Sequence, residues 1–351
     1  MNNNASPVEL DGSDGEGGGQ ILRTGLTLSM ITQRPLSITQ IRAKRPKPGL
    51  MRQHLACVQA AREICGGKVD GDALGSTSLQ FTPGHVRPGS YAFAIASAGS
   101  CMLLLQTLLP ALLLAEGPSE IELAGGTHNP MVPPFHFIEQ SLAPLIHRMG
   151  GELRLTLQRC GFYPAGGGQV TAHIVPGPLE PFDLLTRGAP IEKAALCLAP
   201  ALHRKVAQRE LETTGEMLGW QGEQLRLLPA RQNEGPGNAL MARLAFEQVT
   251  ELITEIGEKS VSAETVSHQL VDAVRRYLAD TAPVGEHLAD QLVLLLALAC
   301  WKTQGSASFV CTGITPHTRT NCAVIERFLS SLAITLDDNR LVRIEQRQLA
   351  P

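Results

Sequence analysis

Residues 101–157 decide the fold. Separated only by short spacers, they read CMLLLQTLLPALLL, SEIELA, GGTHNPMVPP, FHFIEQSLAPLIHRM and ELRLTL. The spacing of the apolar residues predicts, in this order, a Leu-rich helix, a short strand, a polar loop, an amphipathic helix and another strand.

The same order of segments occurs twice more. Residues 20–82 contain QILRTGLTLSMI, PLSITQI, RAKRPKPGL, MRQHLACVQAAREI and STSLQFT, and residues 290–346 contain DQLVLLLALACW, ASFVC, TGITPHTRT, NCAVIERFLSSLAI and LVRIEQ. Three copies of one pattern predict a repeat-built α/β (α+β) protein. Residues 186–282 break the pattern. We therefore expect a smaller inserted α/β domain there, and a large catalytic domain made of residues 1–185 and 283–351.

The composition restricts function and location. The chain has 351 residues, of which 43% are hydrophobic and 18% charged, as in globular proteins with a large core. Its net charge of −3 argues against an extensive basic surface that binds long nucleic-acid duplexes through their phosphates. Eight cysteines without a CxxC pair, and an N-terminus without a signal region, indicate reduced thiols in the cytoplasm. The apolar run 102–115 is too short for a bilayer, so no membrane role is expected.

Each repeat has a polar loop between the end of a strand and the start of a helix, where backbone N–H groups and the helix dipole favour anions. These loops carry Arg42, Arg45, His128 and His317, and we expect them to converge on one phosphate-rich site. The run 41–62 contains seven basic side chains, counting histidine, and no acid. Arginine forks bind phosphate bidentately, so this run predicts phosphate binding, with a solvated basic face as the alternative.

Two further motifs bear on nucleotide chemistry. DGSDGEGGGQILRTG (residues 11–25) lacks the GK[ST] of a Walker A motif, but it offers Glu16 as an oxygen ligand for a divalent metal carried in with a nucleotide; a tight turn is the alternative. KVDG (residues 68–71) matches the short motif in which ATP-dependent ligases carry AMP on lysine. The repeat pattern places Lys68 in a surface turn at the pole opposite the polar loops, which favours a structural role.

His317 has three interpretations: a loop residue satisfied by a carbonyl, a metal ligand, or a nucleophile. Zinc binding lacks partners at ligand spacing. A neutral imidazole can attack the α-phosphorus of ATP when its other nitrogen is held by a hydrogen bond. Asp290 and Gln291, at the edge of a Leu-rich run, could reach the same site and hold a base, a ribose or the histidine.

Seven blocks in one order carry a family resemblance between residue 10 and about residue 330: LDGSDGEGGGQILRT, RAKRPKPGLMRQH, GGTHNPMVPPF, GFYPAGGGQV, GEKSVSAE, EHLADQ and HTRTN. With these blocks the chain resembles the RNA 3′-terminal phosphate cyclase family. The resemblance implies a large domain of three repeats, each with two helices on a four-stranded sheet, and a smaller α/β insert. Such a fold is similar to enolpyruvyl transferases and to the C-terminal domain of a translation initiation factor.

The resemblance also implies a reaction. ATP adenylates a histidine and releases pyrophosphate, AMP moves to the 3′-terminal phosphate of RNA, and the 2′-oxygen closes a 2′,3′-cyclic phosphate as AMP leaves. Arginines and a divalent metal, Mg²⁺ or Mn²⁺, would neutralise charge at phosphorus. The implied partner is RNA with a 3′-terminal phosphate. No membrane partner is expected, and a homodimer is one option for the assembly.

Site residues follow from the matching positions. The resemblance makes His317 the AMP-carrying nucleophile and Glu16 a metal ligand. It assigns nucleotide binding to Gln106, Pro133, His287, Leu288, Ala289, Asp290 and Gln291, and phosphate or RNA binding to Arg23, Arg42, Arg45, Gln53 and His54. His287 stands where family members often stack a tyrosine on adenine, which predicts weaker base stacking here.

Two other functions share this architecture. A noncatalytic RNA-binding relative that acts in ribosome maturation would lack the histidine, which this chain keeps. An enolpyruvyl transferase would bind two small anions and show no nucleotide-dependent labelling. We rank the cyclase first, the RNA-binding relative second and the transferase third.

Overall fold

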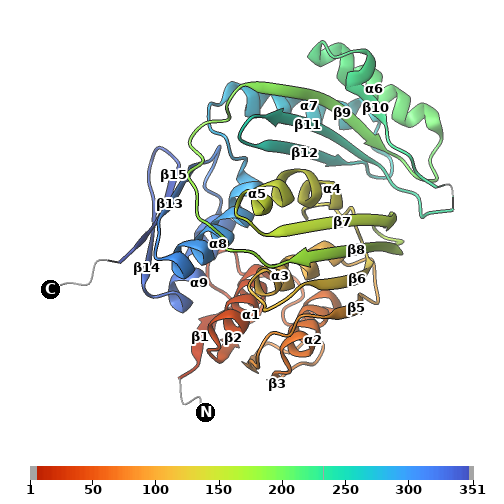
Figure 1. Cartoon of the computed structure of the whole chain (residues 1–351). Helices are drawn as coiled ribbons and strands as arrows, with labels where there is room; N and C mark the ends of the chain where they lie inside the picture. Colours follow the sequence, from red (N-terminus) through yellow and green to blue (C-terminus); the bar gives the residue numbers. More distant parts are fainter. Residues whose placement is uncertain (1–5, 232, 348–351) are drawn as a thin grey trace.

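The first two repeats share one strand order. The computed structural model describes residues 6–231 and 233–347 (Figure 1). In the first repeat the order is β1-β2-β4-β3, with β1 and β2 parallel and the other neighbours antiparallel. Its elements are β1 (Val8–Asp11), α1 (Gln20–Thr32), β2 (Leu36–Thr39), α2 (Arg52–Cys65), β3 (Lys68–Asp70) and β4 (Leu79–Thr82). Two helices thus accompany a four-stranded sheet, as predicted.

The second repeat copies this order as β5-β6-β8-β7. It consists of β5 (Ser90–Ala94), α3 (Cys101–Leu113), β6 (Ser119–Gly125), α4 (Phe135–Phe137), η1 (Ile138–Leu142), α5 (Ala143–Arg148), β7 (Glu152–Arg159) and β8 (Gly168–Val175). The single helix expected over residues 135–149 is interrupted by the π-helical turn η1. The next helix, α5, has Pro144 in its first turn. Because proline has no backbone N–H to donate, the regular helical hydrogen bonds are interrupted at this point.

The third repeat departs from the expected four strands. It contains α8 (Glu286–Thr303), β13 (Ala307–Val310), α9 (Pro316–Phe328), β14 (Leu332–Leu336) and β15 (Leu341–Gln346), with the strands in the order β13-β15-β14. Two isolated parallel bridges take the place of the first strand: Leu184 pairs with Phe309, and Val284 pairs with Cys311. Leu184 and Val284 flank the insert, which therefore interrupts the strand that begins this repeat.

Three apolar helices, α1, α3 and α8, form the middle of the molecule. Every residue of α3 except Gln106 is buried, and α8 buries the whole run 292–300. Helices that are apolar on nearly all sides are stable only inside a core. α1 packs against both α3 and α9, so the first repeat contacts the other two. Among the described helices, none combines the length and the hydropathy needed to cross a bilayer.

The insert has its own sheet, in the order β10-β9-β11-β12. Its elements are β9 (Pro190–Leu198), α6 (Arg204–Leu218), η2 (Gly222–Gln224), β10 (Leu225–Leu227), β11 (Ala239–Phe246), β12 (Thr250–Ile256) and α7 (Ala263–Ala279). α6 and α7 pack on the sheet around a small core that includes Trp220 and Tyr277 (Figure 1). Leu196, Met241 and Leu252 of the same sheet belong to the main core, and β12 contacts α4 and η1. The insert therefore packs directly on the second repeat, while its boundaries at 186 and 282 stay a prediction.

Glu251 joins the insert to the third repeat. It lies on β12, is 4% exposed, and its Oε2 accepts a hydrogen bond from the N–H of Gly285 at 3.0 Å. Gly285 is the N-cap residue of α8, so the carboxylate satisfies a backbone donor at the positive end of that helix. Burial raises the pKa of Glu251 from its ordinary 4.5 to about 7, although the bond from Gly285 and the charge of Arg187 oppose this shift.

The Glu251 carboxyl should make stability depend on pH. Because its pKa in the folded state is raised, its stabilising contribution is complete below about pH 4.5 and is lost as the pH rises through about 7. That loss amounts to roughly 3 kcal/mol. We expect Glu251→Gln, which keeps an oxygen acceptor for Gly285, to melt at a higher temperature than the wild type at pH 8 but not at pH 5, in thermal unfolding followed by circular dichroism. Exposed Glu345 supplies the control Glu345→Gln; parallel pH profiles for the wild type and Glu251→Gln would contradict the raised pKa.

Candidate active site

His317 lies in the first turn of α9 and not in the loop before a helix, where the sequence pattern placed it. Thr315 is the N-cap residue: its Oγ1 accepts a hydrogen bond from the N–H of Thr318 at 3.0 Å, and Pro316 takes the first helical position. Threonine followed by proline starts a helix well, because the hydroxyl satisfies a free N–H and proline has none to satisfy. The helix therefore begins at Pro316 instead of at residue 321.

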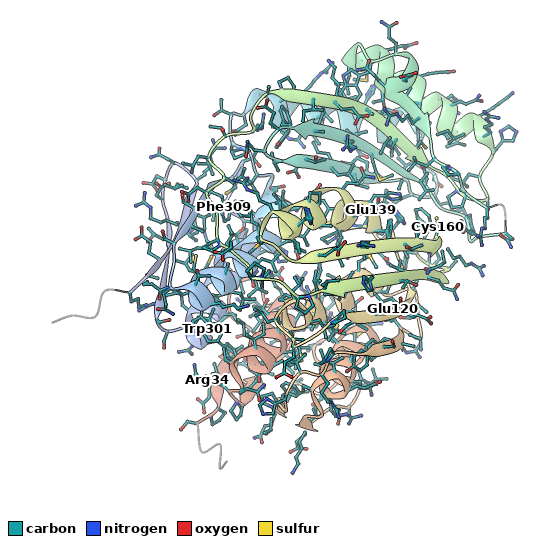
Figure 2. All side chains as sticks on the ribbon, viewed as in Figure 1. Arg34, Glu120, Glu139, Cys160, Trp301 and Phe309 are labelled. Carbon is teal, nitrogen blue, oxygen red and sulfur yellow. The ribbon has the colours of Figure 1, made fainter. Side chains whose placement is uncertain are left out.

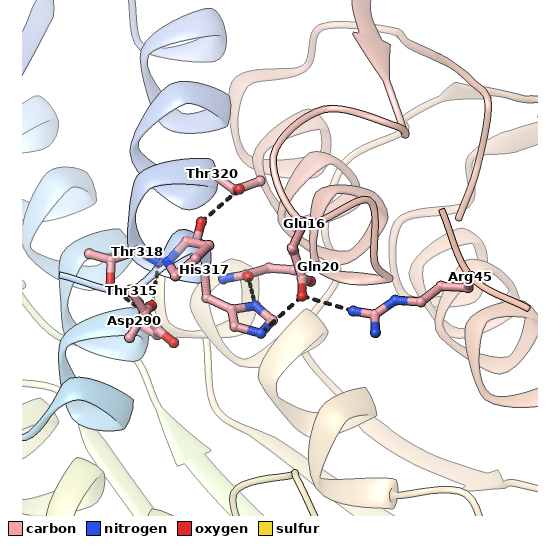
Figure 3. Close-up of polar contacts among 9 residues, drawn as sticks. Glu16, Gln20, Arg45, Asp290, Thr315, His317, Thr318 and Thr320 are labelled. Carbon is pink, nitrogen blue, oxygen red and sulfur yellow. Dashed lines mark hydrogen bonds and ion pairs between the residues drawn. The ribbon is translucent and has the colours of Figure 1, made fainter. Parts of the chain in front are cut away.

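Both ring nitrogens of His317 face oxygen atoms (Figure 3). Nδ1 lies 2.6 Å from Oε1 of Gln20, and Nε2 lies 3.0 Å from Oε2 of Glu16. The same Glu16 oxygen accepts a hydrogen bond from Nη2 of Arg45 at 2.8 Å. Gln20 begins α1, and Arg45 belongs to the loop after β2. The polar loops of the first and third repeats therefore meet at this ring.

Asp290 orients the turn that carries His317. Its Oδ1 accepts hydrogen bonds from the hydroxyl of Thr315, at 3.0 Å, and from that of Thr318. Its backbone oxygen accepts one from Nδ2 of Asn321 at 2.8 Å. Burial raises the pKa of Asp290, and the bonds from Thr318 and Thr315 oppose this shift. Asp290 thus acts on the start of α9 through two threonines, while Gln20 holds the ring itself.

Arg23 and His54 provide donors for an anion. Among the described residues, the guanidinium of Arg23 has no partner in a hydrogen bond or a close ion pair, and burial lowers its pKa. Burial, with the charges of Arg23 and Arg42, lowers the pKa of His54 to about 3, so this imidazole is neutral. Its Nδ1 accepts the N–H of Met51 at 3.3 Å, which leaves the ring hydrogen on Nε2. A partly buried guanidinium with unoccupied N–H groups, next to a neutral imidazole N–H, suits phosphate, although the charge of Glu16 also acts on it.

A pocket between helices of all three repeats adjoins these groups. Its polar lining includes Gln20, Arg23, Gln106, Asp290, Gln291 and Asn321. Nε2 of Gln106 is buried there without a hydrogen-bond partner in the described part of the chain. A buried amide without a partner is costly unless a ligand or water accepts its hydrogen. Gln106 therefore fits the predicted role of binding a nucleotide.

The other predicted nucleotide residues differ in their surroundings. His287 lies in the first turn of α8 with its side chain 76% exposed. Leu288 and Ala289 are completely buried in the main core, so their side chains do not line the pocket. Pro133 is partly buried in the loop between β6 and α4. The roles of these four residues stay predictions.

The basic residues of the first repeat also differ from one another. Nη1 of Arg42 donates to the backbone oxygens of Lys47, at 2.6 Å, and Gly49, at 2.9 Å, so this side chain braces its own loop. Gln53, partly buried, lies at the start of α2 against Gly99 of the second repeat. In this set, Arg23 and His54 have donors that other residues do not occupy, and Arg45 is paired with Glu16.

His128 lies away from the site, contrary to the expectation that all three polar loops converge. It is completely buried, stacks on Phe162 with ring centroids 5.1 Å apart, and places Nε2 2.9 Å from Nδ1 of His136. The flat ring gains more from packing against Phe162 than from solvent, and its two nitrogens find local partners.

Lys68 is exposed on β3, beyond the C-terminal end of α2, whereas Gln53 lies at the start of the same helix.

Several residues of the site were not among those predicted. Gln20 holds His317, and Oγ1 of Thr24 donates to Oδ1 of Asn321 at 2.7 Å. The available signal was a polar stripe on an otherwise apolar helix, since residues three and four apart share one helix face. Its members are Gln20, Arg23, Thr24 and Thr27, all of which line the pocket.

These features define a repeat-built α/β protein with a polar site centred on a histidine, in which Arg23 and His54 offer donors suited to an anion. Within residues 6–231 and 233–347, no group of three or more His, Cys, Asp or Glu side chains could hold a metal ion. A divalent ion at Glu16 would therefore take its other ligands from phosphate oxygens and water, which is common for Mg²⁺.

The family follows from comparison with known proteins. The family model described as RNA 3′-terminal phosphate cyclase matches residues 14–333. Proteins of that name are similar to this chain: the one from Koribacter versatilis (strain Ellin345) is 48% identical, with 95% of this chain and 93% of that protein covered. The one from Ectopseudomonas mendocina (strain ymp) is 46% identical, with 97% and 98% covered. The one from Ralstonia nicotianae (strain ATCC BAA-1114 / GMI1000) is 50% identical, with 94% of each covered.

The chain therefore belongs to the RNA 3′-terminal phosphate cyclase family, and the prediction of a ligase-class enzyme of this family is confirmed. Among solved structures, the enolpyruvyl transferase NikO from Streptomyces tendae is 20% identical over 48% of this chain and 33% of that chain, with a TM-score of 0.29. So low a score supports no conclusion.

Gly19 keeps Arg23 and His54 accessible. A Cβ at position 19 would lie 2.3 Å from Nε2 of His54 and 2.9 Å from Nη1 of Arg23. Its φ of −81° suits alanine, so only the methyl group would interfere. We expect Gly19→Ala to weaken the binding of tripolyphosphate by about tenfold or more in isothermal titration calorimetry, because both donors must move. Gly117→Ala, whose Cβ would meet only Pro88 at 3.5 Å, should bind like the wild type. If Gly19→Ala binds tripolyphosphate as tightly as the wild type, the anion does not bind at Arg23 and His54.

Proposed function

We propose that this chain is an ATP-dependent enzyme that converts the 3′-terminal phosphate of RNA to a 2′,3′-cyclic phosphate through a histidine–AMP intermediate. The observation that carries the proposal is the arrangement at His317. Gln20 holds Nδ1 at 2.6 Å, which leaves Nε2 as the nitrogen that can attack phosphorus. Membership of the family supports the same assignment.

The proposed reaction consists of three displacements at phosphorus. Nε2 of His317 attacks the α-phosphorus of ATP, the bond to the bridging oxygen of the β-phosphate breaks, and pyrophosphate leaves. An oxygen of the RNA 3′-phosphate then attacks the same phosphorus, and the N–P bond breaks to return its electron pair to the imidazole. Finally, the 2′-oxygen attacks the 3′-phosphorus, its proton passes to solvent, and AMP leaves. Arg23 and His54 would stabilise the charge on the phosphate oxygens with donors that are already in place.

Glu16 controls access to the nucleophile in this proposal. Its carboxylate faces Nε2 of His317 at 3.0 Å, so it must turn away before phosphorus can approach. Glu16 would then hold Mg²⁺ or Mn²⁺ together with phosphate oxygens, and the ion would supply further neutralisation of phosphate charge. Once Glu16 has turned, Arg45 has no carboxylate partner and is available to phosphate.

The proposed partner is RNA that ends in a 3′-phosphate, and the proposed location is the cytoplasm. All eight cysteines are free and buried. Unpaired thiols are typical of a reducing compartment.

Labelling with ATP that carries a radioactive α-phosphate tests the proposal. In the presence of a divalent metal, we expect label on the wild type and on Lys68→Ala, and none on His317→Asn, because only the imidazole can form the phosphoramidate. Peptide mapping after denaturing electrophoresis would identify the labelled residue. Label on Lys68 would indicate ligase-like chemistry, whereas no label on any protein would favour the noncatalytic RNA-binding relative.

Gln20 supplies a separate test of the histidine's orientation. Gln20→Met keeps the size of the side chain but removes the acceptor for Nδ1 of His317. We expect the single-turnover rate of adenylation to fall by about ten- to a hundredfold, with little change in ATP affinity, because the nucleophile is misplaced while the phosphate donors remain. Exposed Gln59 on α2 offers the matched control Gln59→Met. An unchanged rate would show that Gln20 does not position the ring.

A further inference from the structure

The turn between β7 and β8 presents an aromatic ring to solvent. Tyr163 is 68% exposed, whereas the preceding Phe162 is 2% exposed and stacked on His128. The N–H of Gly166 donates to the backbone oxygen of Phe162 at 2.6 Å and closes the turn. In Figure 2, Cys160 marks the start of this turn at the edge of the molecule. Tyr163 therefore stands exposed on a well-anchored turn.

A second exposed apolar side chain lies on the adjoining loop. Met131, between β6 and α4, is 101% exposed. The two loops are joined, because the N–H groups of Thr127 and His128 both donate to the backbone oxygen of Gly161, at 2.8 and 3.0 Å. Single exposed apolar residues are ordinary on protein surfaces. Two of them on loops that are joined by hydrogen bonds indicate a binding surface.

These loops connect to the anion-binding groups of the site. Nδ2 of Asn129 donates to the backbone oxygen of Ala98 at 2.7 Å, and Gly166 also lies against Ala98. From the other side, Nη1 of Arg52 donates to the backbone oxygen of Ala96 at 3.2 Å. Arg52 begins α2, two residues before His54. The segment 95–100 thus spans the distance between the exposed side chains and the phosphate donors.

The exposed charge along these segments is positive, and the nearby carboxylate of Glu234, which acts on Cys160, is buried. The segments 41–54, 95–100, 125–134 and 159–168 contain no aspartate or glutamate. Arg52, Arg159 and Arg231 are exposed, and Nη2 of Arg159 donates to the backbone oxygen of Asn233, which holds the insert's loop beside the turn. Glu234 of that loop is only 6% exposed.

We propose that Tyr163 and Met131, with Arg52, Arg159 and Arg231, form a track that binds the single-stranded nucleotides preceding the terminal phosphate. The inference rests on the proposed function, since the track leads away from the phosphate donors. A positive path with an exposed ring is how proteins bind single strands: arginines contact phosphates, and a base stacks on the ring. The absence of carboxylates and of a wide apolar surface along these segments favours RNA over a protein partner.

Binding by RNAs of two lengths tests the track. A 5′-fluorescent decamer with a 3′-phosphate reaches Tyr163 in this proposal, and a dinucleotide 3′-phosphate does not. In fluorescence anisotropy without ATP, we expect Tyr163→Ala to bind the decamer about five- to a hundredfold more weakly and Tyr163→Phe to bind like the wild type, since a base stacks on either ring. Competition by the unlabelled dinucleotide should be the same for all three proteins.

The salt dependence of binding supplies a second test. Arg231→Gln should lower the slope of log affinity against log salt by about 0.7, and Lys68→Ala, which removes a charge at the far end of α2, should not.

Three outcomes would overturn the track: equal binding of both lengths by the wild type, unchanged decamer binding by Tyr163→Ala, or equal losses for decamer and dinucleotide. The binding assay needs no catalysis, so its result is separate from the adenylation of His317. Labelled His317 with no effect of Tyr163→Ala would reject the track alone. Weak decamer binding by Tyr163→Ala without any labelled histidine would support an RNA track and reject the proposed reaction.

Discussion

The site depends on how α1 packs against α9. His317 and Gln20 are 297 residues apart in the sequence, as are Asn321 and Thr24, and each pair is joined by a polar contact. The two contacts are one helical turn apart on both helices, so together they restrict both the rotation and the sliding of one helix relative to the other. Because buried polar partners must meet or remain unsatisfied, they specify a single register that apolar packing alone would leave loose.

The apolar helices make that register possible. α1, α3 and α8 bury nearly all of their surface, and each large apolar side chain contributes roughly 1.5–3 kcal/mol when removed from water. This core can carry the polar stripe of α1 and the buried Asp290, whose cost is offset by hydroxyls from two threonines. His317, the proposed nucleophile, accordingly sits in the first turn of a packed helix and is held by the first residue of another.

Three arginines near the site have three different electrostatic situations. Arg23 is partly buried and has no close ion-pair partner among the described residues, although the charge of Glu16 acts on it, so we expect an anion to gain most by binding there. Arg45 shares Glu16 with His317, and in the proposed reaction it would exchange that carboxylate for phosphate. Arg42 is committed to carbonyl oxygens of its own loop and maintains the loop's shape. Arginines that look equivalent in the sequence thus differ in their partners: Arg23 has none in a hydrogen bond, Arg45 has a carboxylate, and Arg42 has carbonyl oxygens of its own loop.

The sequence by itself determined the three repeats, the insert and the family, because apolar periodicity and ordered motif blocks can be read from the order of the residues alone. It also predicted His317, Glu16, Arg23 and His54 as site residues, all of which lie in those blocks. Only the tertiary structure decided that Gln20 holds the imidazole, that Arg42 braces its loop, that His128 turns inward onto Phe162, and that the insert interrupts the first strand of the third repeat. Each of these depends on which groups meet across long separations in the chain, and that is set by the packing of buried helices and the satisfaction of buried polar atoms, neither of which is visible in the spacing of residues.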